Sequence, residues 1–151
     1  MKSARRRSRE LAVQALYQWQ ITSTAAQEGV STDTAGAAQA YIRETPDFHK
    51  ADETYFTSLY TGVIDNADAL RALITPHIDR PLAELSPVEH GILLVAAYEL
   101  QNQLEVPYKV VINEAVEIAK SFGGTDGFKY VNGVLDKLAG EVRVLEVGAQ
   151  V

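Results

Sequence analysis

The chain has 151 residues, of which 46% are hydrophobic and 23% are charged. These proportions are typical of one globular domain and exclude a disordered tail. Because the sequence contains no cysteine, disulfide bonds, thiolate metal ligands and a cysteine nucleophile are excluded. The longest uncharged apolar stretch, residues 91–98, is far shorter than the roughly 20 residues of a membrane span, and no secretory signal is visible. We therefore expect a cytoplasmic protein with no membrane partner.

The net charge of −6 is unevenly distributed. Residues 1–10 contain five basic side chains and one acidic side chain, whereas the rest of the chain contains nine basic and nineteen acidic ones. The five cations are Lys2, Arg5, Arg6, Arg7 and Arg9. A cationic segment on an acidic body can bind a polyanion at that one end. Arginines that are solvated and bind nothing specific are the alternative, and charge alone does not choose between the two.

The first predicted helix carries these cations in its opening turns. Its buried face follows from apolar residues at three-to-four spacing, namely Leu11, Ala12, Ala15, Leu16 and Trp19. Ser3 can cap this helix, so the arginine cluster becomes part of it. Five cations at a helix N-terminus oppose the helix dipole, which favours an anion at this position.

Residues 22–46 are rich in Thr, Ala, Gly and Ser at their start, and we expect a variable linker or insertion there. A short helix is predicted at 37–44, where Pro46 ends the pattern. Apolar stripes then predict one helix from Asp52 to about Asn66 and another over 70–78. Pro76 is expected to kink or end the second of these helices.

The segment Ser86-Pro87-Val88-Glu89 has a Ser N-cap, a Pro at the first position and a Glu as in a capping box, so it predicts a helix start. The helix that follows is apolar nearly all round and should be central and buried. Pro107 opens another helix that stops at Gly123. Thr125 or Asp126 caps a last one, and the tail after Gly140 is ambiguous. With no period-two run, the class is all-α with about seven helices.

Catalytic and metal sites are not indicated. Three histidines lie on different segments without ligand spacing, namely His49, His77 and His90. Glu114 and Glu117 lie three residues apart, as paired acid–base carboxylates can, but Glu117 can equally pair with Lys120 or Ser121 on a solvated face. We expect no catalytic residue, no metal, no cofactor and no small-molecule substrate.

The turn over residues 122–130 has a different potential. Backbone N–H groups at the start of the last helix are joined there by a cation and aromatic rings, which suit the phosphates and bases of a single-stranded nucleic acid. The side chains concerned are those of Phe122, Phe128, Lys129 and Tyr130. The alternative is that Phe122 and Tyr130 belong to the core, and this turn alone is a weak signal.

Three blocks of sequence resemble one known family. They are residues 5–17 (RRRSRELAVQALY), residues 106–123 (VPYKVVINEAVEIAKSFG) and residues 129–136 (KYVNGVLD). In this collinear order they are similar to the NusB family of bacterial transcription antitermination factors. The resemblance covers nearly the whole chain, and the long second block is highly specific. Residues 22–50 match this family poorly.

The resemblance implies two small packed helical bundles without catalytic activity. It also implies binding of single-stranded boxA RNA from ribosomal RNA operons. The expected partners are NusE, a small-subunit ribosomal protein, and the RNA polymerase elongation complex with other Nus factors. Tyr17 and Glu89 fall where the family meets NusE. The residues that the resemblance assigns to RNA are Lys2, Arg5, Arg6, Arg7, Arg9, Phe122, Asp126, Lys129 and Tyr130.

Two other hypotheses remain open at this point. Ribosomal RNA cytosine methyltransferases carry a similar domain at their N-terminus, and the chain could be a fragment of one. Such an enzyme needs a further Rossmann-type domain and catalytic cysteines, which this sequence lacks. The chain could also be a protein–protein scaffold whose arginines are merely solvated, and salt-dependent RNA binding would separate this hypothesis from RNA recognition.

Overall fold

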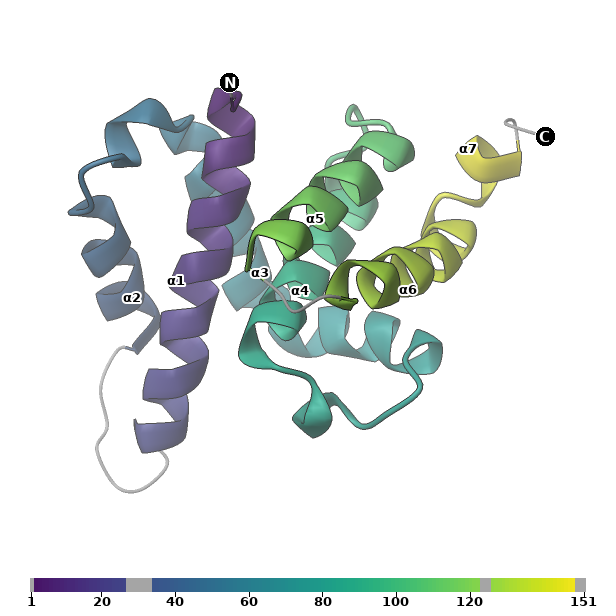
Figure 1. Cartoon of the computed structure of the whole chain (residues 1–151), viewed down its shortest axis with the longest axis horizontal. Coiled ribbons are helices and arrows are strands. Elements are labelled where there is room, and N and C mark those ends of the chain that lie inside the picture. The colour runs from purple at the N-terminus through teal and green to yellow at the C-terminus, as the bar shows by residue number, and fades with distance from the viewer. Residues whose placement is uncertain (1, 27–33, 123–125, 149–151) are drawn as a thin grey trace. The chain divides into compact units, whose positions relative to one another are not determined.

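The computed structural model describes residues 2–26, 34–122 and 126–148, and over these ranges it contains helices but no strand (Figure 1). Three short 3-10 helices are η1 (Phe48–Lys50), η2 (Thr75–His77) and η3 (Leu82–Glu84). The α-helices are α1 (Ala4–Ala26), α2 (Thr34–Arg43), α3 (Glu53–Ile74), α4 (Pro87–Asn102), α5 (Tyr108–Phe122), α6 (Gly127–Val142) and α7 (Val144–Gly148). The all-α prediction is confirmed. Among the described residues, no helix is both long and apolar enough to span a bilayer.

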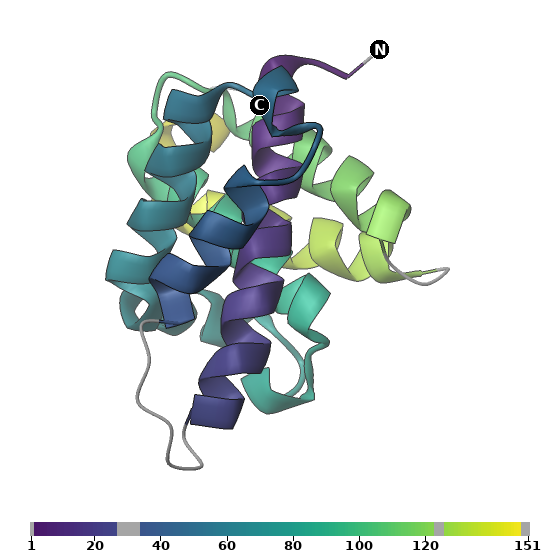
Figure 2. The same cartoon turned by 90° about the vertical axis from the view of Figure 1, so that its left-hand side faces the viewer.

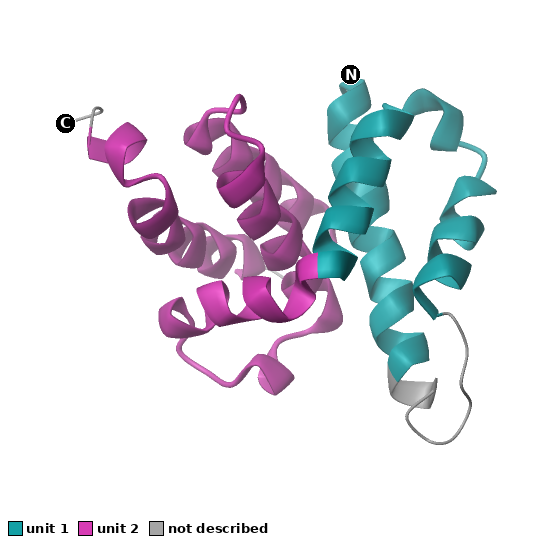
Figure 3. Ribbon diagram, turned by 180° about the vertical axis from the view of Figure 1, so that it is seen from behind, with its two compact units in different colours: residues 1–65 teal, residues 66–151 magenta. Residues whose placement is uncertain are grey.

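The chain divides into two compact helical units, residues 1–65 and 66–151 (Figure 3). The expectation of two small bundles is therefore confirmed. The division falls inside α3, whose backbone leaves helical geometry at Asn66, with φ −124° and ψ 18°. Two helices were predicted on either side of this residue, and the structure has two helical segments joined there across a kink. Helix α3 ends at Ile74, before Pro76, because proline has no N–H for the helical ladder.

In the first unit, α1 and α2 lie side by side (Figure 2). The helix predicted at 37–44 is confirmed, with a start three residues earlier, and helix also covers residues 22–26 and 34–36, where a linker was expected. The alanines in this segment favour helix, and Ala38 and Ile42 of α2 are buried. Packing of one apolar face thus stabilises a helix that composition alone indicated only weakly.

In the second unit, α4 is the central helix, and α5 and α6 pack against it and against each other. It begins as predicted, because the Ser86 hydroxyl oxygen accepts a hydrogen bond from the backbone N–H of Glu89 at 3.1 Å. Its buried residues lie on every side of the helix. They are Gly91, Ile92, Leu93, Leu94, Val95, Ala96, Ala97, Glu99 and Leu100.

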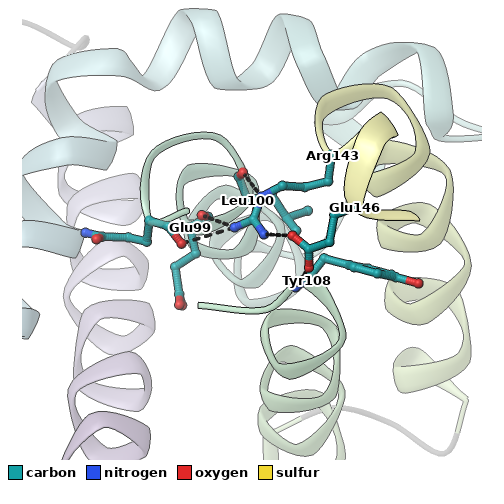
Figure 4. Close-up of polar contacts among 6 residues, drawn as sticks. Glu99, Leu100, Tyr108, Arg143 and Glu146 are labelled. Carbon is teal, nitrogen blue, oxygen red and sulfur yellow. Dashed lines mark hydrogen bonds and ion pairs between the residues drawn. The ribbon is translucent and has the colours of Figure 1, made fainter. Parts of the chain in front are cut away.

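The C-terminal end of α4 is closed by a buried arginine (Figure 4). The Arg143 guanidinium donates to the carbonyl oxygens of Leu100 at 2.6 Å, Glu99 at 3.2 Å and Gln103 at 3.1 Å. These carbonyls lie at the C-terminal end of the helix, where backbone acceptors lack the next turn of N–H donors. Those of Glu99 and Gln103 also accept from the backbone N–H groups of Gln103 and Val106, at 2.9 and 3.0 Å. A cation at this end also complements the negative end of the helix dipole.

Glu146 of α7 extends this arrangement to the start of α5. One of its carboxylate oxygens accepts from Arg143 at 2.6 Å, and the other accepts from the backbone N–H of Tyr108 at 2.7 Å. The Tyr108 N–H, and next the Arg143 guanidinium, hold the pKa of Glu146 below its ordinary value. One ion pair therefore ties α7 to the end of α4 and to the beginning of α5.

We predict that Arg143→Met lowers the free energy of unfolding by about 2–4 kcal/mol, because it removes the side-chain donor to the Leu100 carbonyl and leaves the Glu146 carboxylate without its cation. Urea denaturation followed by circular dichroism measures this loss. Lys137→Met is the control, since Lys137 is an exposed residue of α6, and a change within about 0.5 kcal/mol is expected for it. Equal losses in the two variants would contradict a stabilising role for the Arg143 contacts.

Candidate nucleic-acid interface

The N-terminus of α1 carries the predicted cationic segment on a capped helix. The Ser3 hydroxyl oxygen accepts from the backbone N–H of Arg6 at 3.0 Å, which confirms the predicted cap. Lys2 and Arg5 are exposed, whereas Arg6 and Arg7 are partly buried. The cluster is thus part of a regular helix, and its side chains project from fixed positions.

A buried hydroxyl attaches this helix end to the start of α3. The Ser8 side chain is fully buried, and its oxygen lies 2.7 Å from the carbonyl oxygen of Asp52. The Asp52 N–H in turn donates to the carbonyl of Ala4 at 3.2 Å, and the Asp52 carboxylate accepts from the N–H of Tyr55 at 3.1 Å. These contacts hold the arginine-bearing turns in place, so binding an anion does not require them to order first.

Arg9 does not lie on the outer surface. It is 4% exposed, its guanidinium lies 5.3 Å from the centre of the Tyr55 ring, and it donates to the Tyr55 hydroxyl at 3.4 Å. The guanidinium of Arg5 lies 4.3 Å from the centre of the same ring. We correct the expectation for Arg9, which packs inside the first unit. Its spacing from Ala12 and Leu16 on the buried face was the signal in the sequence.

Lys2 and Arg7 border a hollow of about 240 Å³ in the first unit. Its other walls come from Glu10, Leu11, Gln14, Thr45, Pro46 and Asp47. The Lys2 ammonium pairs with the Glu10 carboxylate at 3.0 Å, which partly neutralises it, whereas Asp47 pairs with Lys50 at 3.4 Å. Exposed pairs of this kind contribute little stability, and a phosphate can replace the carboxylate.

Of the predicted second surface, the structure describes the residues up to Phe122 and those from Asp126 onward. Residues 123–125, which include the predicted cap Thr125, lie outside the described residues. Phe122 at the end of α5 is 40% exposed. Asp126 occupies the N-cap position of α6, but its side chain makes no capping hydrogen bond. Its carboxylate instead pairs with Lys129 at 3.3 Å, and both side chains are exposed. Asp126 is therefore the N-cap by position, as one of the two predicted residues, but its side chain does not cap the helix.

Tyr130 takes part in packing rather than in an open aromatic surface. It is partly buried, and the Arg80 guanidinium lies 4.5 Å from the centre of its ring. Burial raises the pKa of its hydroxyl above the ordinary value. Because a cation already occupies its ring, Tyr130 is a poor platform for a base, and Phe122 is the better exposed aromatic side chain here.

The two residues expected at a protein partner lie on different units. Tyr17 is 38% exposed on α1, and Ile21, one turn further along, is 45% exposed. Sequence reasoning missed Ile21, although its spacing of four residues from Tyr17 places both on one face. Glu89 lies in the first turn of α4, where a β-carbon added at Gly127 would stand 3.3 Å from its carboxylate.

His90, beside Glu89, is held in its neutral form. Its Nε2 accepts a hydrogen bond from the Arg71 guanidinium at 3.2 Å. Burial, and next the charge of Arg71, lower the pKa of His90 from 6.5 to about 4. The hydrogen bond from Arg71 to the neutral imidazole is a structural contact. Glu89 is therefore the charged side chain that this helix start offers to a partner.

No catalytic arrangement is found among these parts. Within the ranges that the structure describes, no group of three or more His, Asp or Glu side chains could hold a metal ion. The Glu117 carboxylate pairs with Lys120 at 3.6 Å, and Ser121 donates to the Glu117 carbonyl at 3.2 Å, as the simpler alternative predicted. Fold and site together define a helical protein with five of its fourteen basic residues gathered at one helix end.

Comparison with known proteins identifies the family. A family model described as "NusB family" matches residues 6–140, and the chain belongs to this family. The transcription antitermination protein NusB of Bordetella pertussis is 57% identical over 148 residues, covering 98% of this chain and 93% of that protein. The protein of the same name from Paraburkholderia phytofirmans is 53% identical, covering 99% and 97% respectively.

A solved structure of T. maritima NusB has the same fold, with a TM-score of 0.77 and 30% identity over 93% of this chain and 94% of that one. Family members are non-enzymatic transcription antitermination factors. The alternative hypothesis of a methyltransferase fragment is therefore set aside.

We predict that the stability of the protein falls as the pH decreases from about 6.5 to about 4, in part through His90. The unfolded chain takes up this proton near pH 6.5, but folded His90 does so only near pH 4, so protonation favours the unfolded state. His90→Gln keeps an acceptor for Arg71 and should make the loss shallower. Urea denaturation across this pH range measures the free energy of unfolding for both proteins. If this free energy falls equally steeply with pH in His90→Gln and in the wild type, the prediction is contradicted.

Proposed function

We propose that the protein acts in transcription antitermination by binding single-stranded boxA RNA of ribosomal RNA operons together with NusE. It does so in the cytoplasm, within the elongating RNA polymerase complex and with other Nus factors. The observation that carries this proposal is the capped and anchored N-terminus of α1, where five of the fourteen basic residues of an otherwise acidic chain are gathered. Membership of the NusB family supports the same role.

The phosphate contacts are proposed for Lys2, Arg5, Arg6 and Arg7. Lys2 and Arg7 border the hollow at this end of α1, and the acids beside them can exchange for phosphate oxygens. Arg9 supports them as a positioning residue, because its packing on Tyr55 fixes the helix face from which its neighbours project. Arginine suits phosphate because its planar donors match two oxygens at once.

A second contact is proposed at Phe122, Asp126 and Lys129. Phe122 is exposed enough to stack on an unpaired base, and Lys129 supplies a cation at the start of α6. Asp126 tempers this attraction, since its carboxylate competes with phosphate for Lys129. Tyr130 supports this contact by packing its ring against the Arg80 guanidinium, and it does not stack on a base.

The NusE contact is proposed for Tyr17 and Glu89. Tyr17 and Ile21 form an exposed apolar pair on α1, and amphipathic aromatic rings of this kind anchor protein interfaces. Glu89 offers a negative charge to a basic ribosomal protein. The second candidate function, a protein–protein scaffold with solvated arginines, would use the same NusE contact but would not bind RNA.

We predict that Arg6→Ala combined with Arg7→Ala weakens binding of a short boxA-type RNA and flattens its salt dependence. Each lost phosphate contact lowers the slope of log K against log salt by about 0.7 for a single strand. Fluorescence titration at several salt concentrations, with and without NusE, measures both effects. Lys137→Ala removes an exposed cation elsewhere and is the control. A slope equal to that of the control would favour the scaffold hypothesis.

We predict that Glu89→Lys weakens NusE binding at least about tenfold, because it places a cation opposite a basic partner. RNA binding without NusE should stay at the wild-type level. Isothermal titration calorimetry measures the affinity for NusE, and circular dichroism checks that α4 still forms. We expect α4 to form because the Glu89 backbone N–H, not its side chain, bonds to Ser86. Unaltered NusE affinity in the folded variant would place the partner contact elsewhere.

A further inference from the structure

A groove of about 450 Å³ runs between α5 and α6 in the second unit, and these two helices are neighbours in Figure 1. It lies within the volume range of small-ligand sites, about 300–1,000 Å³. Of its lining residues, only Lys129 has a part in the function proposed above. The others that the argument uses are Lys109, Asn113, Val116, Phe128 and Asn132.

The groove has an apolar floor and a polar rim. Ile112 is buried, Val116 and Phe128 are partly buried, and Asn113 and Asn132 are exposed. The Phe128 ring has two ammonium groups near it, with Lys120 at 5.1 Å and Lys129 at 6.0 Å from its centre. A flat apolar group can therefore lie in the groove while its charged or polar edge meets the rim.

The charge of the groove contrasts with that of its surroundings. Residues 66–151 contain seven basic and twelve acidic side chains, yet three of the four lysines in this range border the groove or contact its Phe128. Lys109 is exposed and has no acidic partner within the described part of the chain. It also stands in the first turn of α5, where the helix dipole adds positive potential. The groove is also lined by one carboxylate, that of Asp136, against the ammonium groups of Lys109 and Lys129. Its lining therefore carries a net charge of +1 within an acidic unit, which favours an anion.

Two amide side chains occupy the middle of the groove. Asn113 is central among the α5 residues that line it, and Asn132 is central among those of α6. Neither side chain makes a hydrogen bond to another described residue. A side-chain amide both donates and accepts, which is the pattern needed to meet the edge of a nucleobase.

We infer that this groove binds an unpaired nucleobase and its adjoining phosphates, as an extension of the RNA path beyond Lys129. The inference rests on the proposed function, because it needs an RNA strand that already meets the start of α6. Lys129 and Lys109 hold phosphates at the two ends, Phe128 and Val116 contact the face of the base, and the two amides meet its edge. The exposed pairs of Lys129 with Asp126 and of Lys120 with Glu117 yield to phosphate.

The first test compares two RNAs, a boxA core and the same core extended at both ends by its flanking operon sequence. Asn113→Ala combined with Asn132→Ala should lower the affinity for the extended RNA about tenfold, the effect of losing one base-edge contact, and leave that for the core within about twofold. Lys109→Ala should lower the salt slope for the extended RNA by about 0.7. Lys137→Ala, an exposed lysine of α6 outside the groove, is the matched control.

The second test observes the groove directly. In the full-length protein, the side-chain NH2 resonances of Asn113 and Asn132, assigned with the single alanine variants, should shift when the extended RNA is added. The backbone amides of residues 109–116 report whether the variants remain folded. Unshifted side-chain resonances under saturating extended RNA overturn the inference.

The outcomes separate this inference from the proposed function. If the Arg6 and Arg7 variant loses RNA affinity while the groove variants match the Lys137→Ala control, the groove is not part of the RNA path. If neither RNA binds the wild-type protein with or without NusE, the proposed function itself fails. If the groove variants weaken NusE binding but not RNA binding, the occupant is a protein segment, and the inference is wrong.

Discussion

The second unit depends on the burial of α4 on all sides. The start of this helix is open to solvent, and the Ser86 hydroxyl caps it. Its other end is buried at Glu99 and Leu100, so the carbonyls there need donors from the protein, and Arg143 supplies the one for Leu100. Because Arg143 is itself a buried cation, it requires Glu146, whose second oxygen then accepts from the N-terminus of α5. Glu146 thus links this end of α4 to the start of α5 and to α7.

The surface features of this unit follow from the same arrangement. With α5 and α6 packed on α4 by their apolar faces, their polar residues remain at the outer junction between the two helices. Lys109, Asn113 and Asn132 are placed there, and so are the lysines around Phe128. At the start of α4, Glu89 stands against Gly127, where a larger residue would meet its carboxylate. Packing of the core therefore decides which charged groups of an acidic unit are available to partners.

In the first unit, the N-terminal end of α1 carries cations and also packs one face into the core. Ser8 and Arg9 are buried on that face, while Lys2 and Arg5 are exposed. Contact of Arg9 with the Tyr55 ring, together with the link from Ser8 to Asp52, holds this end against α3. A fixed backbone presents cations to a polyanion without the entropic cost of ordering a flexible arm. The burial of one arginine thus serves the function of its neighbours.

The sequence by itself determined the helical class, the caps at Ser3 and Ser86, and the family, because these depend on local spacing and on contiguous motifs. Tertiary structure decided which arginines face solvent, because the burial of Arg9 depends on Tyr55, which lies 46 residues further along the chain. A helix at 37–44 and a break near Asn66 were predicted from the sequence; packing decided that the first begins at Thr34 and that the helices on either side of Asn66 are joined across a kink. Asp126 has the residue type of an N-cap, yet its carboxylate meets Lys129 instead. The Arg143 contacts join carbonyls more than 40 positions away, and no local pattern encodes such a pairing.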